Sequence, residues 1–334
     1  MNNSFWESKK VFVTGSAGFI GSHLTEELVR NGAEVTGLVQ YNSLSDIELL
    51  KYIDPIARDN MDIVFGDIRD SYQIDNITKG MDFVFHLAAL VGIPYSYSAS
   101  NSYISTNIIG SSNVFNACIK NNIKKVIHTS TSEVYGTAQY TPIDESHPLV
   151  GQSPYSASKI SADMLLNSYC MSFGLDAVIL RPFNNYGPRQ SARAIIPTII
   201  NQAVSSSKIE LGNPDSYRDF VFARDTARGF LAIAESNMNS AEVFNLAYGK
   251  QISIKDLVDK VLELTGNEDK EIVFNRPDRV RPEKSEVYSL VGDASKLSDK
   301  TNWMPETNLE NGLIETIEFI KRNQDLYGSI EYRV

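Results

Sequence analysis

The sequence predicts an α/β protein built on a doubly wound parallel sheet, with a smaller lobe formed by the C-terminal half. Three observations support this class. Apolar runs alternate with helical patterns through the first half, a glycine-rich turn links the first run to the first helical pattern, and proline and glycine punctuate the chain after residue 181. Near-continuous apolar strands that alternate with helices are typical of a parallel sheet covered on both faces.

The expected elements follow in order from these patterns. We predict strands at the apolar runs 11–14, 34–39, 61–65, 81–87, 125–129 and 176–180. Helical patterns lie between most of them, at 20–31, 102–121 and 155–172. The first of these helices carries Ile20, Leu24 and Leu28 on one face, which is the spacing of an amphipathic helix. In the second half we predict short strands near 242–246 and 271–274 and helices at 194–206, 223–236, 253–265 and 309–322.

The glycine-rich turn after the first strand has the spacing G-x-x-G-x-x-G. Glycines let the backbone turn tightly and approach a pyrophosphate, while the following helix offers free N–H groups at its positive end. The turn therefore predicts a Rossmann-type dinucleotide-binding sheet. The residues expected to bind the cofactor here are Gly15, Ala17, Gly18, Phe19, Ile20 and Gly21.

The same reasoning divides the chain into two parts. We predict a dinucleotide-binding Rossmann domain over residues 1–180 and a mainly substrate-binding lobe over residues 181–334. Some segments of the second half are expected to return to the first domain. Because ligand sites commonly lie between lobes, we expect the substrate in the cleft that separates them.

A second motif lies at the start of the helix expected over 155–172, where Tyr155 and Lys159 are four residues apart. Positions i and i+4 share one helical face, so the ammonium can favour the phenolate, lower the pKa of the tyrosine and make it a general base. Thr131, Ser132 and Glu133 follow a predicted strand, at the sheet edge where α/β active sites assemble. We predict that these five residues are catalytic.

Composition and charge exclude several classes of protein. The formal net charge of −10 disfavours a nucleic-acid partner, which would require a basic face. No apolar run reaches the length of a membrane span, and the polar N-terminus does not resemble a signal peptide. The two cysteines and four histidines have no metal-binding spacing. We therefore expect a cytoplasmic protein with no metal site and no membrane segment.

Further stretches match one family in order along nearly the whole chain: GDIRD at 66–70, HLAA at 86–89 and RPFNNYGPR at 181–189. With these motifs the chain resembles the extended short-chain dehydrogenase/reductases of the nucleotide-sugar epimerase/dehydratase group. The resemblance implies a bound NAD cofactor and a nucleotide-sugar substrate. It also implies cofactor contacts from Asp67, Ile68, Leu87, Ala88, Ala89, Asn107, Tyr155 and Lys159.

Two longer stretches narrow the resemblance. HLAALVGIPYSY at 86–97 and NYGPRQSARAIIP at 185–197, supported by RPEKSEV at 281–287, are similar to NDP-N-acetylglucosamine 4,6-dehydratases of the legionaminic acid type. This resemblance implies that UDP- or GDP-N-acetylglucosamine is converted to the 4-keto-6-deoxy sugar. The expected substrate contacts are Tyr95, Asn184, Arg189, Arg193, Arg218, Arg281 and Glu286, with Arg218 and Arg281 as a clamp for the pyrophosphate.

Two departures from the family pattern bear on chemistry. The dTDP-glucose 4,6-dehydratases carry Thr-Asp-Glu where this chain has Thr131-Ser132-Glu133, and their aspartate protonates the departing 6-hydroxyl. A serine has no proton of that acidity, so Glu133 would serve as base at carbon 5 and acid at carbon 6, or a water would assist. NAD-binding members usually end the second strand with an aspartate for the ribose. Residues 39–42 contain neither that aspartate nor an arginine for NADP, so NADP is not excluded.

Other functions remain open on this scaffold. A UDP-glucuronate decarboxylase or a nucleotide-sugar 4-epimerase would share the first oxidation step, and Thr-Ser-Glu also resembles the decarboxylases. A non-catalytic NAD(P)-binding sensor is an alternative of another class, which the complete Tyr/Lys/Thr set disfavours.

We further expect a homodimer through a four-helix contact, as in the family that the chain resembles. The helices at 102–121 and 155–172 carry more apolar residues than one sheet face should require: Ile104, Ile108, Met164, Leu165 and Tyr169.

Overall fold

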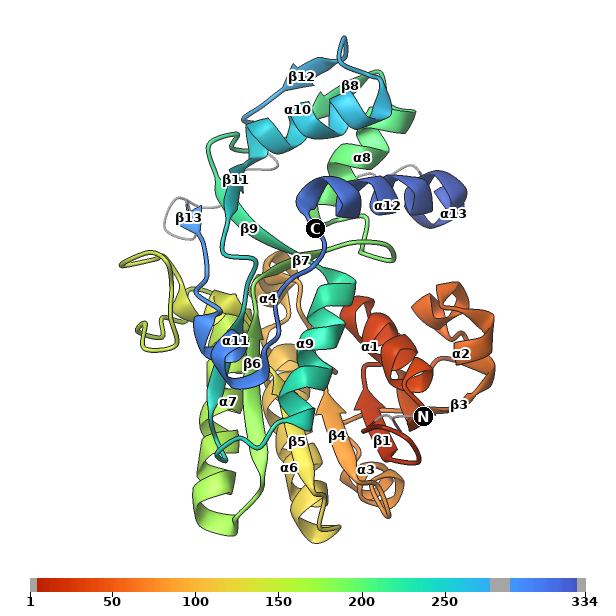
Figure 1. The fold of residues 1–334 in the computed structure, drawn as a ribbon, viewed down its shortest axis with the longest axis vertical. Helices are drawn as coiled ribbons and strands as arrows, with labels where there is room; N and C mark the ends of the chain where they lie inside the picture. Colours follow the sequence, from red (N-terminus) through yellow and green to blue (C-terminus); the bar gives the residue numbers. More distant parts are fainter. Residues whose placement is uncertain (1–4, 277–288, 329–334) are drawn as a thin grey trace.

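The computed structural model describes residues 5–276 and 289–328. Seven parallel strands form one sheet in the order β10-β6-β5-β4-β1-β2-β3 (Figure 1). The strands of this sheet are β1 (Lys10–Thr14), β2 (Glu34–Gln40), β3 (Met61–Gly66), β4 (Phe83–His86), β5 (Lys125–Thr129), β6 (Ala177–Pro182) and β10 (Val243–Leu246). The predicted α/β class with a large parallel sheet is confirmed.

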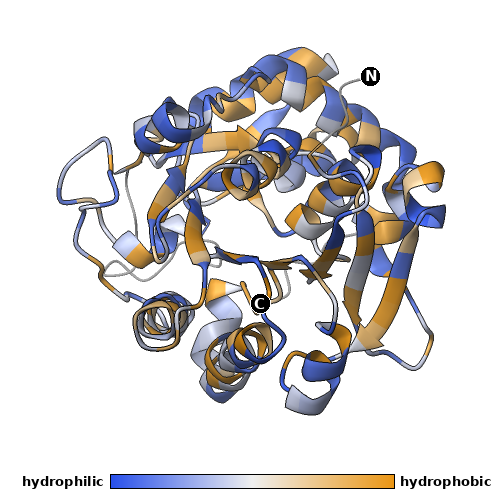
Figure 2. Ribbon diagram, turned by 60° about the horizontal axis from the view of Figure 1, so that its bottom comes forward, coloured by the Kyte–Doolittle hydropathy of each residue, from blue (hydrophilic) through white to orange (hydrophobic). Residues whose placement is uncertain are grey.

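Helices cover both faces of the sheet. On one face α1 (Phe19–Arg30) packs beside α9 (Ala223–Glu235). The helices of the other face are α3 (Ser71–Ile77), α6 (Ser111–Lys120) and α7 (Pro154–Phe173). Side chains alternate along β1, so that Val11 and Val13 enter the first core and Phe12 enters the second. Figure 2 shows the hydrophobic strands enclosed by helices that carry hydrophilic residues as well as hydrophobic ones.

The C-terminal lobe has a separate core around β9 (Tyr217–Phe222), which pairs with three other short strands. Its remaining strands are β7 (Asn184–Tyr186), β8 (Lys208–Glu210), β11 (Gln251–Ser253), β12 (Glu271–Val273) and β13 (Ser289–Leu290). Its helices are α8 (Ile195–Ser205), α10 (Ile254–Thr265), α12 (Leu309–Arg322) and α13 (Gln324–Tyr327). From the second half of the chain, α9 and β10 pack in the first domain, together with α11 (Ser295–Thr301).

The helix predicted over 102–121 is divided in the structure. It consists of α5 (Ser100–Tyr103), a π-helical segment η2 (Ile104–Gly110) and α6. A π-helical turn holds more residues than an α-helical one, so it changes which side chains face the sheet. A methyl group on Gly110, at the end of η2, would lie 2.6 Å from the side chain of Ile68. The helix therefore packs closely against the loop after β3, and a larger residue here would displace the side chain of Ile68.

Several short elements were not predicted because they span too few residues for a periodic pattern. They include η1 (Glu48–Tyr52), α2 (Pro55–Asp59), α4 (Ile93–Ser98) and the 3₁₀ turn η3 (Ser132–Tyr135). None of the described helices has the length and apolar character needed to cross a bilayer.

Candidate active site

A cavity of about 790 Å³ lies at the carboxyl ends of the parallel strands and is lined by residues of both lobes. Strands β1 to β6 deliver their following loops to this edge, because all of them run in the same direction. This is the edge at which doubly wound sheets bind ligands. The cavity is therefore the candidate active site.

The glycine turn forms one wall of the cavity. Gly15 has a left-handed backbone (φ +72°), and a methyl group on it would lie 2.8 Å from the backbone nitrogen of Ala88. A methyl group on Gly21 would lie 2.0 Å from the carbonyl oxygen of Gly15. Helix α1 then starts at Phe19, with no side-chain cap and no acidic residue in its first turn. Its first N–H groups are thus available to an anion, and all six residues predicted for this turn line the cavity.

The loops after β3 and β4 form the next part of the wall, and the five residues predicted there also line the cavity: Asp67, Ile68, Leu87, Ala88 and Ala89. Thr14 fixes the second loop, because its hydroxyl oxygen accepts hydrogen bonds from the backbone nitrogens of Leu87 and Ala88, both at 3.1 Å. Asp67 accepts a hydrogen bond from Arg69 Nε at 2.9 Å, and this interaction holds its pKa below the usual range.

Asn107 is buried behind the cavity wall rather than in it. Its side chain accepts a hydrogen bond from Leu90 N at 2.8 Å and donates to Leu90 O at 3.0 Å and to Ser158 Oγ at 2.9 Å. These bonds tie the loop after β4 to α7. Asn107 therefore positions the cavity wall through the backbone of Leu90.

Tyr155 enters the cavity from the first turn of α7, where Ser153 and Ser156 form a capping box. The tyrosine is 7% exposed, and burial raises its pKa well above the usual value, while a hydrogen bond with Thr131 acts in the opposite direction. We expected Lys159 to lower this pKa, but in the structure burial has the larger effect.

Lys159 lies one helical turn along α7 and is 4% exposed. Its Nζ donates a hydrogen bond to the carbonyl oxygen of Thr129 at 2.6 Å. Burial lowers the pKa of Lys159 to about 8, and the nearby carboxylate of Asp163 opposes this shift. The lysine is not among the residues that line the cavity and supports it from behind.

The predicted triplet at the end of β5 separates into two kinds of position. Thr131 and Glu133 line the cavity, whereas Ser132 is 3% exposed and does not. The hydroxyl oxygen of Thr131 accepts a hydrogen bond from Glu133 N at 3.2 Å, which starts the turn η3. Ser132 is therefore packed away from the cavity, while its neighbours Thr131 and Glu133 face it.

The C-terminal lobe contributes Asn184, Arg193 and Arg218, three of the expected substrate contacts, to the lining. Three lining residues have a buried polar atom that lacks a hydrogen-bond partner: Thr129 Oγ1, Asn184 Nδ2 and Gln190 Oε1. Buried polar groups are nearly always paired in folded proteins, so such atoms indicate a polar ligand. Together with the glycine turn, they fit a dinucleotide and a hydroxyl-rich substrate.

The structure corrects the prediction made for Arg189. We predicted a substrate contact, but its side chain is 4% exposed and lies outside the cavity lining. It forms an ion pair with Glu26 at 2.8 Å and a hydrogen bond with His23 at 2.6 Å, both on α1. Its left-handed backbone (φ +69°) turns the side chain toward this helix. Arg189 therefore joins the second half of the chain to the cofactor-binding helix.

Tyr95 lies on α4 and is 46% exposed, and it is also absent from the lining. Its ring centroid is 6.1 Å from that of Tyr103, which in turn lies 6.3 Å from that of Tyr155. Tyr95 is thus connected to Tyr155 through the ring of Tyr103. Arg281 and Glu286 lie outside the described residues.

Sequence reasoning missed several lining residues, among them Glu48, Arg69, Gln190 and the segment 211–213. Arg69 and Gln190 lie inside stretches that were recognised, at 66–70 and 185–197, so the motifs themselves could have suggested them. Glu48 lies in a loop without periodicity, and no local pattern indicates it. Among the described residues, no group of three or more histidine, cysteine, aspartate or glutamate side chains is arranged to hold a metal ion.

Comparison with known proteins agrees with this geometry. A family model described as GDP-mannose 4,6 dehydratase matches residues 12–316. A dTDP-glucose 4,6-dehydratase from Actinoplanes sp. is 30% identical over 321 residues, covering 94% of this chain and 98% of that protein. The sequence similarity thus extends over both lobes.

Solved structures with similar folds include enzymes of two reaction types. The UDP-N-acetylglucosamine 4-epimerase from Methanobrevibacter ruminantium, in complex with UDP-N-acetylmuramic acid, has a TM-score of 0.86 and 34% identity, covering 95% of this chain and 99% of that chain. The dTDP-glucose 4,6-dehydratase from Streptomyces venezuelae, with NAD bound, has a TM-score of 0.84 and 26% identity, covering 95% of this chain and 98% of that chain.

Proposed function

This chain belongs to the GDP-mannose 4,6-dehydratase family, and from that premise we propose that it is an NAD-dependent 4,6-dehydratase of a nucleotide-activated N-acetylglucosamine. The product would be the 4-keto-6-deoxy sugar. The observation that carries the proposal is that Thr131, Glu133 and Tyr155 line the same cavity as the glycine turn. A dehydratase needs these proton-transfer groups within reach of one sugar ring that lies against the cofactor.

NAD held by the glycine turn and the loops after β3 and β4 would supply reversible two-electron chemistry, accepting hydride from carbon 4 and returning it at carbon 6. Tyr155 takes the proton of the 4-hydroxyl, and Thr131 donates a hydrogen bond at the same oxygen. Once carbon 4 is a ketone, the proton at carbon 5 is acidic enough for Glu133 to remove it. The 6-hydroxyl then leaves as water after it receives a proton. Carbon 5 regains a proton from solvent when carbon 6 is reduced, so the nucleotide sugar undergoes no net change of oxidation state.

Glu133 is assigned both proton transfers of the elimination. The buried position of Ser132 outside the cavity lining supports this assignment, because no second acid follows Thr131. A carboxylate that accepts the proton of carbon 5 becomes a carboxylic acid, and it can return that proton to the departing oxygen. Glu133 can act first as base and then as acid if the hydrogen of carbon 5 and the hydroxyl of carbon 6 are both within reach of its carboxyl group.

The substrate assignment depends on the stretches at 86–97 and 185–197 and on the likeness to a UDP-N-acetylglucosamine epimerase. Arg193 and Arg218 would meet the pyrophosphate, since a guanidinium suits a phosphate group. Arg281 would complete this clamp. The unpartnered amide nitrogen of Asn184 is a suitable donor to a phosphate or sugar oxygen.

The decisive experiment incubates the purified protein with UDP-, GDP- and dTDP-activated glucose and N-acetylglucosamine and with UDP-glucuronate, and identifies products by mass. Loss of water from an N-acetylglucosamine nucleotide is expected. Loss of carbon dioxide from UDP-glucuronate would replace the proposal with a decarboxylase, and conversion without a change of mass would replace it with an epimerase.

Two variants separate the steps. Tyr155→Phe should prevent oxidation at carbon 4, whereas Glu133→Gln should permit oxidation and block water loss, so that reduced nicotinamide accumulates. Losing one general acid–base group typically lowers the rate by about a hundred- to ten-thousand-fold. Glu271→Gln, an exposed position on β12, is the matched control. Dehydration by Glu133→Gln within a few-fold of the wild-type rate would contradict the role of Glu133.

A 4-epimerase is the second candidate, favoured by the similarity of the fold to the M. ruminantium enzyme. Such an enzyme oxidises and reduces carbon 4 and has no need of a base at carbon 5. It would therefore retain activity in the Glu133→Gln variant and lose it in Tyr155→Phe. The same two variants thus distinguish both candidates from each other.

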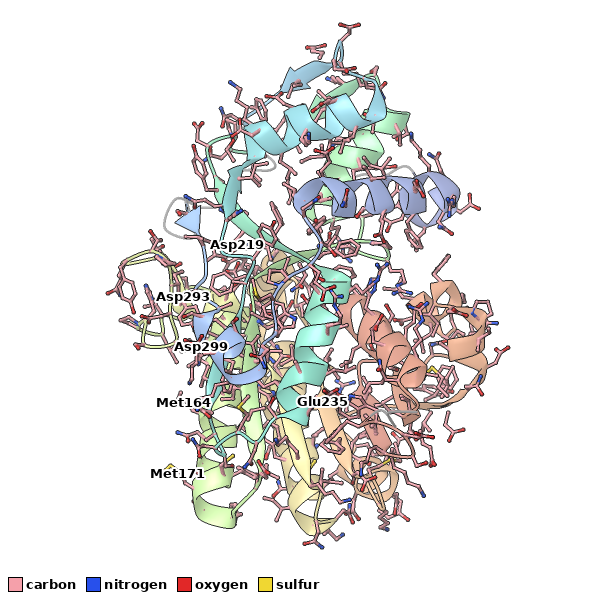
Figure 3. All side chains as sticks on the ribbon, in the orientation of Figure 1. Met164, Met171, Asp219, Glu235, Asp293 and Asp299 are labelled. Carbon is pink, nitrogen blue, oxygen red and sulfur yellow. The ribbon has the colours of Figure 1, made fainter. Side chains whose placement is uncertain are left out.

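The homodimer remains part of the proposal. Met164 and Met171 on α7 are 49% and 80% exposed, and Figure 3 shows both at the outer edge of the molecule. Ile104 and Ile109 of the η2 segment are also half exposed. A second copy that covers these helices would remove this apolar surface from water. Light scattering at micromolar concentration should give the mass of two chains, and a monomer mass would contradict the dimer.

A further inference from the structure

The end of β2 lacks the acidic residue that usually binds the adenosine ribose of NAD. Gln40 occupies the last position of β2 and lines the cavity. An amide can bond to a ribose hydroxyl, but it carries no charge with which to distinguish a hydroxyl from a phosphate. The cavity nevertheless contains a carboxylate at this end, since Glu48 lines it together with Gln40 and Arg69.

A compact turn brings Glu48 back toward the end of β2. Asn42 Nδ2 donates hydrogen bonds to Gln40 O at 3.3 Å and to Asp46 O at 2.9 Å, while Asn42 Oδ1 accepts one from Asp46 N at 2.8 Å. Asp46 Oδ1 then accepts a hydrogen bond from Glu48 N at 2.7 Å. This chain of bonds closes the loop onto itself, and Gln40 and Glu48 both line the cavity.

The following turn η1 fixes the loop to the glycine turn. Leu50 is fully buried in a small cluster with Ala17 of the glycine turn and Val39 of β2. Glu48 itself has a left-handed backbone (φ +49°), which is uncommon for a residue with a side chain. The packing of Leu50 holds this conformation in place, so that the carboxylate of Glu48 stays at the cavity wall.

The charges around Glu48 leave its carboxylate unneutralised. Lys51 pairs with Asp46 at 2.7 Å, and Arg69 pairs with Asp67. No ion pair joins Glu48 to a cation within the described part of the chain. Partial burial raises the pKa of Glu48, the charge of Asp46 adds to this shift, and the charge of Lys51 opposes it without reversing it. A hydrogen bond from a ligand hydroxyl would therefore stabilise the charged form of the Glu48 carboxylate.

We propose that Glu48 replaces the missing acid of β2, accepts hydrogen bonds from the adenosine ribose hydroxyls of NAD, and rejects the 2′-phosphate of NADP. The inference depends on the dinucleotide site of the proposed function. A 2′-phosphate beside Glu48 would meet a like charge and would lose the hydroxyl donor. Arg69 could offset this only by leaving Asp67, which would then lose its partner at the cavity wall.

The test measures dinucleotide affinity by calorimetry for wild type, Glu48→Gln and the control Asp62→Asn. Asp62 is an exposed acid on the neighbouring strand β3 and is absent from the cavity lining. Wild type should bind NAD at least about tenfold more tightly than NADP, since a hydrogen bond to a charged group contributes about ten- to a hundredfold. Glu48→Gln should lower the affinity for NAD, raise the affinity for NADP and so reduce the ratio of the two affinities. Asp62→Asn should leave this ratio unchanged.

The NAD analogue with a 2′-deoxyadenosine ribose provides a second readout. Wild type should bind this analogue more weakly than NAD, and in Glu48→Gln the difference between the two ligands should largely disappear. Equal affinity of wild type for NAD and NADP, or an unchanged ratio in Glu48→Gln, would overturn the inference while leaving the dehydratase proposal intact. Failure of wild type to bind either dinucleotide would overturn both.

Discussion

Removing the buried carboxylate of Asp163 should destabilise the protein by about 3–5 kcal/mol, the usual cost of breaking a buried ion pair from one side. Asp163 lies on α7 and is fully buried. Its Oδ2 accepts hydrogen bonds from Arg181 Nη2 at 3.0 Å, from Arg181 Nε at 3.3 Å and from Ser130 Oγ at 2.8 Å.

The magnitude follows from what Asp163→Ala leaves behind. Arg181 is 3% exposed, so its charge could not reach water. Its one other hydrogen bond among the described residues goes to the hydroxyl of Tyr135 at 3.1 Å, which is neutral. Replacing both partners, as in Asp163→Leu with Arg181→Met, should cost far less, because no unpaired charge then remains.

The charge of Asp163 should also affect catalysis, because it acts on the pKa of Lys159. The Asp163 carboxylate raises the pKa of Lys159, against the burial that lowers it to about 8. Asp163→Asn keeps an acceptor oxygen and removes the charge, so it should lower this pKa further. Because the ammonium form is lost as pH rises through the pKa, the alkaline limb of turnover should move to lower pH.

Urea unfolding followed by tryptophan fluorescence measures the free energies, and a pH profile of turnover measures the second effect. Ser168→Ala, at an exposed position of the same helix, is the control and should change stability by less than about 0.5 kcal/mol. A decrease of less than about 1 kcal/mol in the free energy of unfolding for Asp163→Ala would refute the reasoning, since a buried unpaired guanidinium should destabilise the protein by more than that.

Three other changes should have distinct results. Gly21→Ala should abolish dinucleotide binding in calorimetry, because its methyl group would lie 2.0 Å from the carbonyl oxygen of Gly15; retained affinity would mean that the turn can yield. Arg189→Ala should lower the urea midpoint because Glu26 loses its buried cation and keeps only the more exposed Arg30, and a higher KM at unchanged stability would restore the substrate role that we first assigned. Asp219, seen in Figure 3 between the lobes, accepts three backbone N–H bonds, and burial raises its pKa from 3.8 to about 6. The folded state therefore binds more protons in this range, so wild type should lose about 2 kcal/mol relative to Asp219→Asn as pH rises from 3.8 to about 6; parallel stability curves would contradict this.

The parts of the site that the sequence determined by itself are those made by local spacing. The glycine turn lies between a strand and a helix, and Tyr155 and Lys159 lie four residues apart on one helix. Their geometry follows from short-range backbone rules, so the pattern predicts it well. The parallel sheet was predictable for the same reason, since each buried strand corresponds to an apolar run in the sequence.

Only the tertiary structure decided which distant side chains join that site. Arg189 is the last residue of the recognised motif at 181–189 and looks like a phosphate ligand, yet a left-handed backbone turns it toward Glu26, which lies 163 residues away. Glu48 has no motif, yet the loop between Asn42 and Leu50 folds it back to the cavity. Local spacing cannot encode either outcome, because the partner of a long charged side chain is chosen by how separate elements pack.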